Sequence, residues 1–389
     1  MALPVITGWY HSQFGKFDQL DPEQMMSDAA LGALQHADIS AEQIDSVHVG
    51  HFNAGFLYQD FPSPLLANRI PELRFTPSVR VENACSTGSA AIYSALQAVL
   101  SGQSKHALVV GFEKMNTLPT AEVGKILLKC CYAKEEAFTE GGFAGVFGTI
   151  AQEYFDRYGD QSDALAMIAA KNHANGALNP YAHMRRDFGF DFCRTPSEKN
   201  PFVAGPLKRT DCSLITDGAA ALVISREDLV GGRQGCVRFL AASQVNDYMP
   251  LSRRDPTFFE GASRAWQQAL STAGLSLNDL SLVETHDCFT IAELIEYEAM
   301  GLAERGQGAR VIAEGISRKD GRLPINPSGG LKSKGHPIGA TGVSMHVMAA
   351  MQLTGQAGEM QLSEANRAGV FNMGGAAVTN YVSILERVK

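Results

Sequence analysis

The stretch that decides the fold is Val81-Glu82-Asn83-Ala84-Cys85-Ser86-Thr87-Gly88-Ser89-Ala90-Ala91, in which a cysteine lies where a loop becomes an apolar helix. Apolar residues then recur with helical spacing up to Leu100, and Ser101-Gly102 ends the helix. The Cys85 thiol therefore lies near a helix N-terminus, where free backbone N–H groups and the helix dipole favour the thiolate, the form that attacks carbonyl carbon. The segment predicts a nucleophile at Cys85, although a buried cysteine that only fills space also fits these residues.

Length and composition favour a large, well-buried α/β protein. The chain has 389 residues, of which 45% are hydrophobic and 19% are charged, and these proportions argue against extended disorder. Its net charge of -8 provides no general basic field for nucleic acid or anionic lipid, so polyanion binding is excluded beyond a local patch. An anionic small ligand could still use such a patch.

Neither a targeting signal nor a membrane segment stands out in the sequence. Met1 to Tyr10 lack a basic region followed by a long apolar run, and no segment approaches the roughly 18 apolar residues that cross a bilayer. Seven scattered cysteines do not form a disulfide framework, so we expect a reducing compartment, the cytoplasm. No Cys-x-x-Cys pattern or closely spaced Cys/His set suggests a zinc site, so we expect no metal site, and packing explains Cys130-Cys131 better.

A pattern near the N-terminus returns late in the chain. The residues from Ala33 to Val47 align with those from Ala269 to Val283 at a constant offset of 236 residues. In the same order, the helix that ends at Ser101-Gly102 resembles 347–356, and each of these helices leads into an apolar strand. Two matched helix–strand successions predict a duplicated α/β unit, with mainly parallel sheets covered by helices.

The middle of the chain interrupts this pattern. Residues 118–213 contain predicted helices at 151–158 and 164–173, followed by polar loops with several prolines. We predict an insertion here, between an N-terminal half formed by 1–117 plus 214–236 and a C-terminal half formed by 237–389. The glycines at 141, 142, 145 and 148 match neither a dinucleotide fingerprint nor a P-loop, so turns and tight packing are expected there.

Reactive groups follow the predicted strands of the C-terminal half. His286-Asp287-Cys288 comes directly after a short strand, at the end of a sheet where α/β proteins bind ligands. A capped helix with a buried Cys288 is the alternative. The glycine-rich stretch 326–342 is the duplicated counterpart of the Cys85 turn, and His336 in it is a candidate base or hydrogen-bond donor. Small residues at 371–377 leave backbone N–H groups free for an oxyanion, or form a plain turn.

At these four places the sequence resembles the thiolase superfamily, and most closely its branch of sterol carrier protein 2 (SCP2)-type thiolases. The resemblance covers nearly the whole chain in order and rests above all on Glu82-Asn83-Ala84-Cys85-Ser86-Thr87-Gly88, His286-Asp287-Cys288-Phe289 and Gly335-His336-Pro337-Ile338-Gly339-Ala340-Thr341-Gly342. It implies an α/β fold with duplicated halves, a layered αβαβα core and an inserted loop domain. Ordinary thiolases carry a second cysteine in a C-terminal Cys-x-Gly turn. Here that turn is Asn372-Met373-Gly374, and Cys288 supplies the second thiol, as in the SCP2-type branch.

The resemblance implies reversible carbon–carbon bond formation and cleavage on coenzyme A thioesters, without a tightly bound cofactor or a metal. Cys85 would be the nucleophile, deprotonated with help from His336, and Cys288 the acid/base. His286 and His336 would donate hydrogen bonds to the enolate oxygen. The backbone N–H groups of Cys85 and Gly374 would form the oxyanion hole of the tetrahedral intermediate.

The resemblance also implies the partners. Ser213 would contact the pantetheine arm of CoA, and the cationic residues of the insertion could meet its phosphates, although a solvated surface explains them equally well: Arg185, Arg186, Lys208 and Arg209. We expect acyl-CoA and CoA as ligands, no nucleic acid or membrane, and a homodimer or homotetramer. The alternatives are a thiolase-like acyltransferase or retro-aldolase that needs a small partner protein, and a non-catalytic CoA- or lipid-binding homologue. Retention of all four candidate catalytic residues argues against the last.

Overall fold

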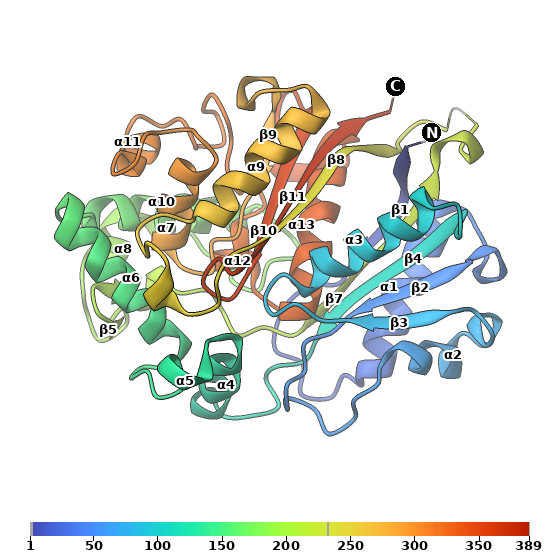
Figure 1. Ribbon diagram of the computed structural model, residues 1–389, viewed down its shortest axis with the longest axis horizontal. Coiled ribbons are helices and arrows are strands. Elements are labelled where there is room, and N and C mark those ends of the chain that lie inside the picture. Colours follow the sequence, from blue (N-terminus) through green and yellow to red (C-terminus); the bar gives the residue numbers. More distant parts are fainter. Residues whose placement is uncertain (1–2, 232, 389) are drawn as a thin grey trace.

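The computed structural model describes residues 3–231 and 233–388 and shows a nine-stranded sheet flanked by helices, with a smaller helical region at one end (Figure 1). The N-terminal half contains β1 (Pro4–His11), α1 (Pro22–Ala37), β2 (Ser46–Gly50), α2 (Leu66–Arg69), β3 (Ser78–Val81), α3 (Thr87–Leu100), β4 (His106–Glu113) and β7 (Gly218–Arg226). The first two residues of the predicted N-terminal half, 1 and 2, lie outside the described ranges.

The C-terminal half follows β7. It contains β8 (Val237–Asn246), α9 (Glu260–Ala273), β9 (Leu282–Glu284), α10 (Thr290–Ala299), α11 (Gly308–Ala313), α12 (Gly330–Lys334), α13 (Ile338–Leu353), β10 (Arg367–Gly374) and β11 (Thr379–Arg387). Together the two halves give the strand order β3-β2-β4-β7-β1-β8-β11-β10-β9. A short pairing of β1 with β8, at Val5–Arg238 and Ile6–Val237, joins them.

The sheet is mixed, so the prediction of mainly parallel pairing is wrong. Only β2–β3, β2–β4 and β9–β10 pair in parallel, and the other neighbouring strands are antiparallel. The physical reason lies in the connections. Parallel strands need a crossover connection, and α3 provides one between β3 and β4, the two strands that flank β2. In contrast, β10 and β11 are joined by four residues, a length that forms an antiparallel hairpin.

Local structure bears out the duplication at the predicted offset of 236 residues. Asp38 ends α1 with a φ of 54°, and its counterpart Gly274 ends α9 with a φ of 66°. The next turns match as well, since the Ser40 N–H donates to Gln43 Oε1 at 3.0 Å and the Ser276 N–H donates to Asp279 Oδ2 at 2.8 Å. The same backbone path and the same side-chain-to-backbone bond therefore occur in both halves.

Five layers result from the way the helices cover the sheet. α1 packs on β1, β4 and β7, α9 packs on β8 and β11, and α3 and α13 lie between the two halves. α13 is buried along its whole length because sheet strands of both halves and α3 surround it. This arrangement is the expected αβαβα order.

Two glycines bring the N-terminal ends of α3 and α13 together. A Cβ on Gly88 would lie 2.7 Å from the Val343 N, and one on Gly342 would lie 2.2 Å from the Ser89 N. Only residues without a side chain allow the two backbones to approach this closely. The loops that precede these helices, which carry Cys85 and His336, therefore meet.

The inserted segment lies between β4 and β7. It contains α4 (Thr120–Leu127), α5 (Ala133–Glu136), α6 (Phe143–Tyr158), α7 (Ser162–Ala177), α8 (Gly189–Arg194), β5 (Phe202–Ala204) and β6 (Leu207–Lys208), and α7 packs on α10 and α12 of the C-terminal half. Gly141 and Gly142 form a turn with positive φ, as predicted. Gly145 and Gly148 instead lie inside α6, where Gly148 packs against Ala204 and a Cβ would lie 2.9 Å from that residue's Cβ.

Candidate active site

Cys85 lies on a strained loop between β3 and α3. The preceding residue, Ala84, has a φ of 50°, a left-handed conformation that costs a non-glycine residue about 1–2 kcal/mol. The loop is held by Asn83, whose N–H donates to Thr87 Oγ1 at 2.8 Å and whose side-chain amide donates to the Tyr381 hydroxyl at 2.8 Å. Strain of this kind persists where the surroundings over-determine the backbone, and it is concentrated at functional sites.

His336 precedes α13 by two residues, as Cys85 precedes α3. Its Nδ1 lies 2.7 Å from Thr341 Oγ1, and the Thr341 hydroxyl donates its hydrogen to the Pro337 carbonyl at 2.9 Å. Because a hydroxyl has a single hydrogen, Thr341 Oγ1 accepts from His336 Nδ1–H. In the neutral ring the lone pair is therefore on Nε2, which is buried and has no hydrogen-bond partner in the described part of the chain. His336 is built as a base.

His286 has the opposite tautomer. The side-chain amide nitrogen of Asn372 lies 2.8 Å from His286 Nδ1, and it also donates to the Cys85 carbonyl at 3.2 Å, which fixes the orientation of the amide. His286 Nδ1 therefore accepts, and the hydrogen is on Nε2. Burial lowers the pKa of His286 to about 4, so the ring is neutral near pH 7. His286 is built as a hydrogen-bond donor.

The two imidazoles converge on Cys85. Cys85 Sγ and one nitrogen of each ring all lie within 4.8 Å of one another, and the rings meet edge to face with centroids 5.1 Å apart. The neighbouring Cys130 thiol, and then His286 and His336, hold the pKa of Cys85 well below its usual value, against the effect of burial. One thiolate and two imidazoles are also ligands that Zn²⁺ binds, a grouping that the spacing along the chain did not reveal.

Cys288 faces the same space from the end of β9. Burial, and then the charge of Cys85, raise the pKa of Cys288 well above its usual value, so the thiol keeps its proton. Its carbonyl accepts from the Ser213 N–H at 2.9 Å. The adjacent Phe289 ring stacks on Phe147 of α6, with ring centroids 4.5 Å apart, so the insertion packs against the loop that carries Cys288.

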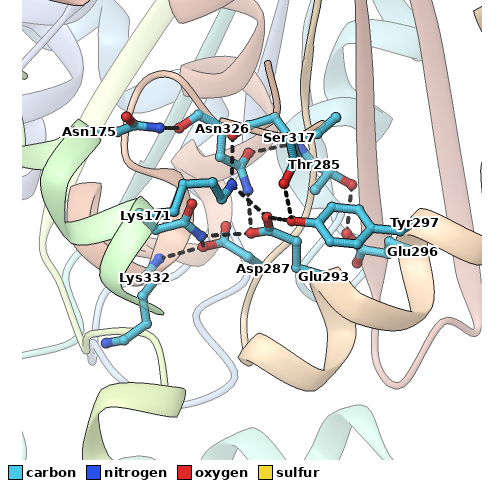
Figure 2. Close-up of polar contacts among 12 residues, drawn as sticks. Lys171, Asn175, Thr285, Asp287, Glu293, Glu296, Tyr297, Ser317, Asn326 and Lys332 are labelled. Carbon is cyan, nitrogen blue, oxygen red and sulfur yellow. Dashed lines mark hydrogen bonds and ion pairs between the residues drawn. The ribbon is translucent and has the colours of Figure 1, made fainter. Parts of the chain in front are cut away.

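Asp287 connects the two catalytic loops and does not cap α10, whose N-cap is Phe289 with no side-chain cap bond. The Asp287 carboxylate accepts from the Leu331 N–H at 2.6 Å, the Lys332 N–H at 3.1 Å and the Asn172 amide at 2.8 Å. Figure 2 shows the buried ion pair of Lys171 with Glu293, at 2.6 Å, beside it. This buried polar cluster fixes the His286–Cys288 loop relative to the loop that carries His336.

Gly374 lies against the nucleophile loop. A Cβ there would come within 2.5 Å of the Asn83 carbonyl oxygen and 2.7 Å of Ser86 Oγ, so only glycine fits. The turn after β10 thus brings its backbone next to Cys85, where the sequence predicts an oxyanion hole.

A cavity of about 720 Å³ reaches Cys85, Cys288 and His336. Ser213 and Arg209 line it, as does Lys125, which sequence reasoning missed. Two other predicted CoA contacts, Arg185 and Arg186, are exposed and lie outside this lining. Lys208 is buried and paired with Asp211 at 3.0 Å, which leaves it unavailable to a phosphate.

Sequence reasoning also missed Thr341, Asn372 and Asn172. All three lie in or beside the motifs that carry the resemblance, and this closeness is the sequence signal that could have identified them as site residues. Their partners are 5, 86 and 115 residues away in the chain, so the bonds themselves appear only in the fold.

Among the described residues, no helix is both long and apolar enough to span a bilayer.

Comparison with known proteins identifies the thiolase family in both the N-terminal and the C-terminal part of the chain. The descriptions "Thiolase, N-terminal domain" and "Thiolase C-terminal domain-like" match residues 5–188 and 242–387. The chain is 33% identical to the acetyl-CoA acetyltransferase of Methanothermobacter thermautotrophicus, over 98% of this chain and 99% of that protein. It is also 33% identical to human sterol carrier protein 2, over 78% of this chain and 57% of that protein.

Solved structures share the fold at lower identity. The Ltp2-ChsH2(DUF35) aldolase superposes with a TM-score of 0.84 at 20% identity, over 100% of this chain and 98% of that chain. Human mitochondrial 3-ketoacyl-CoA thiolase superposes with a TM-score of 0.75 at 17% identity, over 99% of both chains. The two domain matches and the full-length relative show that this chain belongs to the thiolase family and is an acyltransferase.

Proposed function

We propose that this protein catalyses the reversible thiolytic cleavage and Claisen condensation of 3-ketoacyl-CoA thioesters through an acyl-enzyme on Cys85. The observation that carries the proposal is the convergence of two imidazoles with opposite tautomers on Cys85, in a cavity that Cys288 also lines. One base, one neutral donor and a second thiol are the groups that this reaction needs. The acetyl-CoA acetyltransferase relative supports the same substrate class.

The first half-reaction acylates Cys85. The Nε2 lone pair of His336 accepts the Cys85 proton, and the thiolate attacks the thioester carbonyl. When the tetrahedral intermediate collapses, the bond to the CoA sulfur breaks and CoA leaves as its thiol with the proton that His336 returns. The negative charge on the carbonyl oxygen is stabilised by the backbone N–H groups of Cys85 and Gly374. Loss of one such donor costs about 3 kcal/mol in well-studied hydrolases.

The second half-reaction makes or breaks the carbon–carbon bond. In the synthetic direction Cys288 gives its proton to His336 Nε2, and the resulting thiolate removes the α-proton of the second acyl-CoA. The enolate oxygen accepts hydrogen bonds from His286 Nε2–H and from the protonated His336, and the enolate carbon attacks the acyl group on Cys85, which leaves as the thiolate. Acylation of Cys85 removes the nearby negative charge that helps to raise the pKa of Cys288, so its deprotonation becomes easier at this step. In the degradative direction the Cys85 thiolate attacks the 3-keto carbonyl, the carbon–carbon bond breaks, the Cys288 thiol protonates the leaving enolate, and CoA then takes the acyl group from Cys85.

The substrate site extends along the cavity. Ser213 would contact the pantetheine arm, and Arg209 and Lys125, which are exposed and also line the cavity, would meet the CoA phosphates. CoA is thus a substrate and product. A homodimer or homotetramer remains our expectation, which light scattering on the purified protein would decide.

The decisive experiment incubates the purified protein with acetoacetyl-CoA or longer 3-ketoacyl-CoA thioesters and free CoA, and measures the shorter acyl-CoA formed by chromatography. Wild type should cleave them, and Cys85→Ala should lose on the order of 10³-fold or more in rate. Given acetyl-CoA as the acyl donor, Cys288→Ala should still acquire an acyl group on Cys85, seen by mass spectrometry, yet fail to form or cleave the carbon–carbon bond. Cys236→Ala, beside β8, is the matched control and should retain activity. A wild type without cleavage rejects the proposal.

A second candidate is retro-aldol cleavage with a small partner protein, suggested by the name of the Ltp2-ChsH2(DUF35) aldolase, whose chain superposes with a TM-score of 0.84. Such a reaction needs no acyl-enzyme and consumes no free CoA. Turnover that persists in Cys85→Ala, or that requires no CoA, would favour this candidate over the thiolase reaction.

A further inference from the structure

The cavity at Cys85 has one wall that the proposed mechanism does not use. This wall is a face of α4, whose cavity-lining residues recur with helical spacing: Thr120, Ala121, Gly124, Lys125, Leu127 and Leu128. Val123, which does not line the cavity, is fully buried and packs into the main hydrophobic core. The helix therefore packs on the protein with one side and borders the cavity with another.

An apolar surface runs from the reacting groups to this face of α4. Phe289 follows Cys288 in the chain, and its ring centroid lies 6.4 Å from that of Phe143 at the start of α6. Both rings line the cavity, as does Leu127 of α4. Phe138 lines it too, although this residue is 98% exposed to solvent. An exposed apolar surface beside reactive groups is typical of a groove that binds the apolar part of a ligand.

Gly124 lies in the middle of the cavity face of α4. A glycine within a helix is destabilising relative to alanine, and packing does not require it here, because a Cβ built on Gly124 meets nothing within 4 Å. The residues three and four positions to either side, Ala121 and Leu127 among them, all line the cavity. These positions share one face of a helix, so a side chain at 124 would point into the cavity. The glycine therefore leaves a notch in the cavity wall.

The notch lies apart from the wall that we assign to CoA. A Cβ on Gly142 would lie 3.4 Å from the Gly124 carbonyl oxygen, so the turn before α6 lies against α4 beside the notch. Ser213, the proposed pantetheine contact, belongs to a different wall, where its N–H donates to the Cys288 carbonyl at 2.9 Å. The CoA arm and the acyl group can therefore follow different walls of one cavity.

We propose that Gly124 determines acyl-chain specificity, and that the cavity takes a medium-length acyl chain of roughly eight carbons, which lies along α4 with its end in the notch. Gly124 and Leu128 are one helical turn apart, about 6 Å, and an extended chain of single bonds advances about 1.2 Å per bond. An acetyl group cannot cover this distance, whereas a chain of that length can. The inference deepens the proposed function and rests on it, since it takes a CoA ester as the ligand.

The test measures binding of acetyl-CoA and octanoyl-CoA by isothermal titration calorimetry. The full chain carries Cys85→Ala, so that no acyl transfer consumes the ligand. Each methylene buried in an apolar pocket tightens binding by up to about fourfold, and ordering of the chain opposes part of this gain. We therefore expect octanoyl-CoA to bind about 10²-fold more tightly than acetyl-CoA. Adding Gly124→Leu fills the notch and should reduce this ratio to below about tenfold, and Gly124→Ala should reduce it less.

The matched control is Glu122→Leu, which adds the same side chain to an exposed position of α4 outside the cavity lining and should keep the ratio. Leucine is a good helix former, so both leucine variants should fold, and circular dichroism checks this. A ratio near one before Gly124 is changed, an unchanged ratio in Gly124→Leu, or an equal fall in Glu122→Leu would overturn the inference.

The binding measurement is independent of the thiolysis assay, because the protein without Cys85 cannot form the acyl-enzyme. Preferential binding of octanoyl-CoA, together with a wild type that does not cleave 3-ketoacyl-CoA, would refute the proposed function and support the acyl site. Cleavage by wild type without a chain-length preference in binding would support the proposed function and refute the acyl site at Gly124.

Discussion

The two halves of the fold carry different chemistry on the same local frame. In each, a loop leads into a central helix, and the reactive side chain stands two residues before that helix: Cys85 before α3 and His336 before α13. The N-terminal loop leaves its thiol free of side-chain anchors on its own helix, whereas the C-terminal loop ties the imidazole to Thr341. The duplicated loop and helix place the two side chains, and the local hydrogen-bond partners decide which side chain attacks and which accepts the proton.

A second pair of equivalent places shows the same division. At the end of β9 the chain places His286 beside Cys85 and presents Cys288 to the substrate cavity. At the end of β2, the backbone N–H groups of Phe52 and Asn53 donate to the Glu113 carboxylate at 2.9 and 3.0 Å, and Glu113 also accepts from the Gly339 N–H at 3.0 Å. One half therefore uses this strand end for chemistry, and the other uses it to hold the first turn of α13 in place.

The largest expected effect separates the two histidines. His336→Ala removes the base, so acylation of Cys85 should slow by on the order of 10³-fold. His286→Ala removes only a donor to the enolate oxygen. Acylation of Cys85 by acetyl-CoA should therefore stay within about tenfold of wild type, while carbon–carbon cleavage of 3-ketoacyl-CoA falls by about 10²-fold. Rapid-quench mass spectrometry of the acyl-enzyme, alongside steady-state cleavage, measures both steps. Equal loss of acylation in the two variants would contradict the division of roles.

The sequence predicts much of this comparison and misses a definite part of it. The constant offset between the repeats, the Cys85 turn and the His336 turn can be read directly, because each is a local pattern. The relative direction of the strands cannot be read from the sequence, because long-range pairing sets the direction of β1, β7, β8 and β11. The alternation of helices and strands therefore overstated parallel pairing.

The candidate site shows the same limit at the level of single side chains. Lys208 looks like a phosphate contact in the sequence, yet packing of the insertion buries it against Asp211. Asp287 looks like a helix cap, yet its partners come from α7 and α12. The tautomers of His286 and His336 depend on Asn372 and Thr341, and only the folded chain shows which hydrogens these partners have available.

Next in size is the contact that holds the halves together. Gly342→Ala places a Cβ 2.2 Å from the Ser89 N, and the backbone of α3 must move to relieve it, so we expect a loss of about 3 kcal/mol in the free energy of unfolding. Gly124→Ala in α4 is the matched control, because a Cβ there meets nothing within 4 Å, and helix propensity should make it neutral or stabilising by up to about 1 kcal/mol. Denaturant unfolding measures both. Equal stability of the two variants would show that the α3–α13 contact is not required.

Asn372→Asp should reverse the tautomer of His286. A carboxylate accepts but cannot donate, so it would draw the hydrogen to Nδ1 and leave a lone pair on Nε2, where the enolate oxygen needs a donor. We expect carbon–carbon cleavage of 3-ketoacyl-CoA to fall by about 10²-fold, while acylation of Cys85 by acetyl-CoA is retained. Asn372→Ala imposes no tautomer and should lose less. If the alanine variant loses as much as the aspartate variant, Asn372 acts through packing alone.

The smallest effect concerns the anchor that makes the C-terminal loop differ from its N-terminal counterpart. Thr341→Val keeps the volume of the side chain but removes the oxygen that accepts from His336 Nδ1–H, so the ring loses the partner that fixes its base-competent tautomer. We expect acylation of Cys85 to slow by about tenfold with little change in KM, because the ring and not the substrate is affected. Thr341→Ser restores the hydroxyl and should restore the rate. A slow serine variant would mean that the threonine methyl group, packed in the fully buried α13, matters more than the hydrogen bond, and the orientation of His336 would then be set by packing between the two halves.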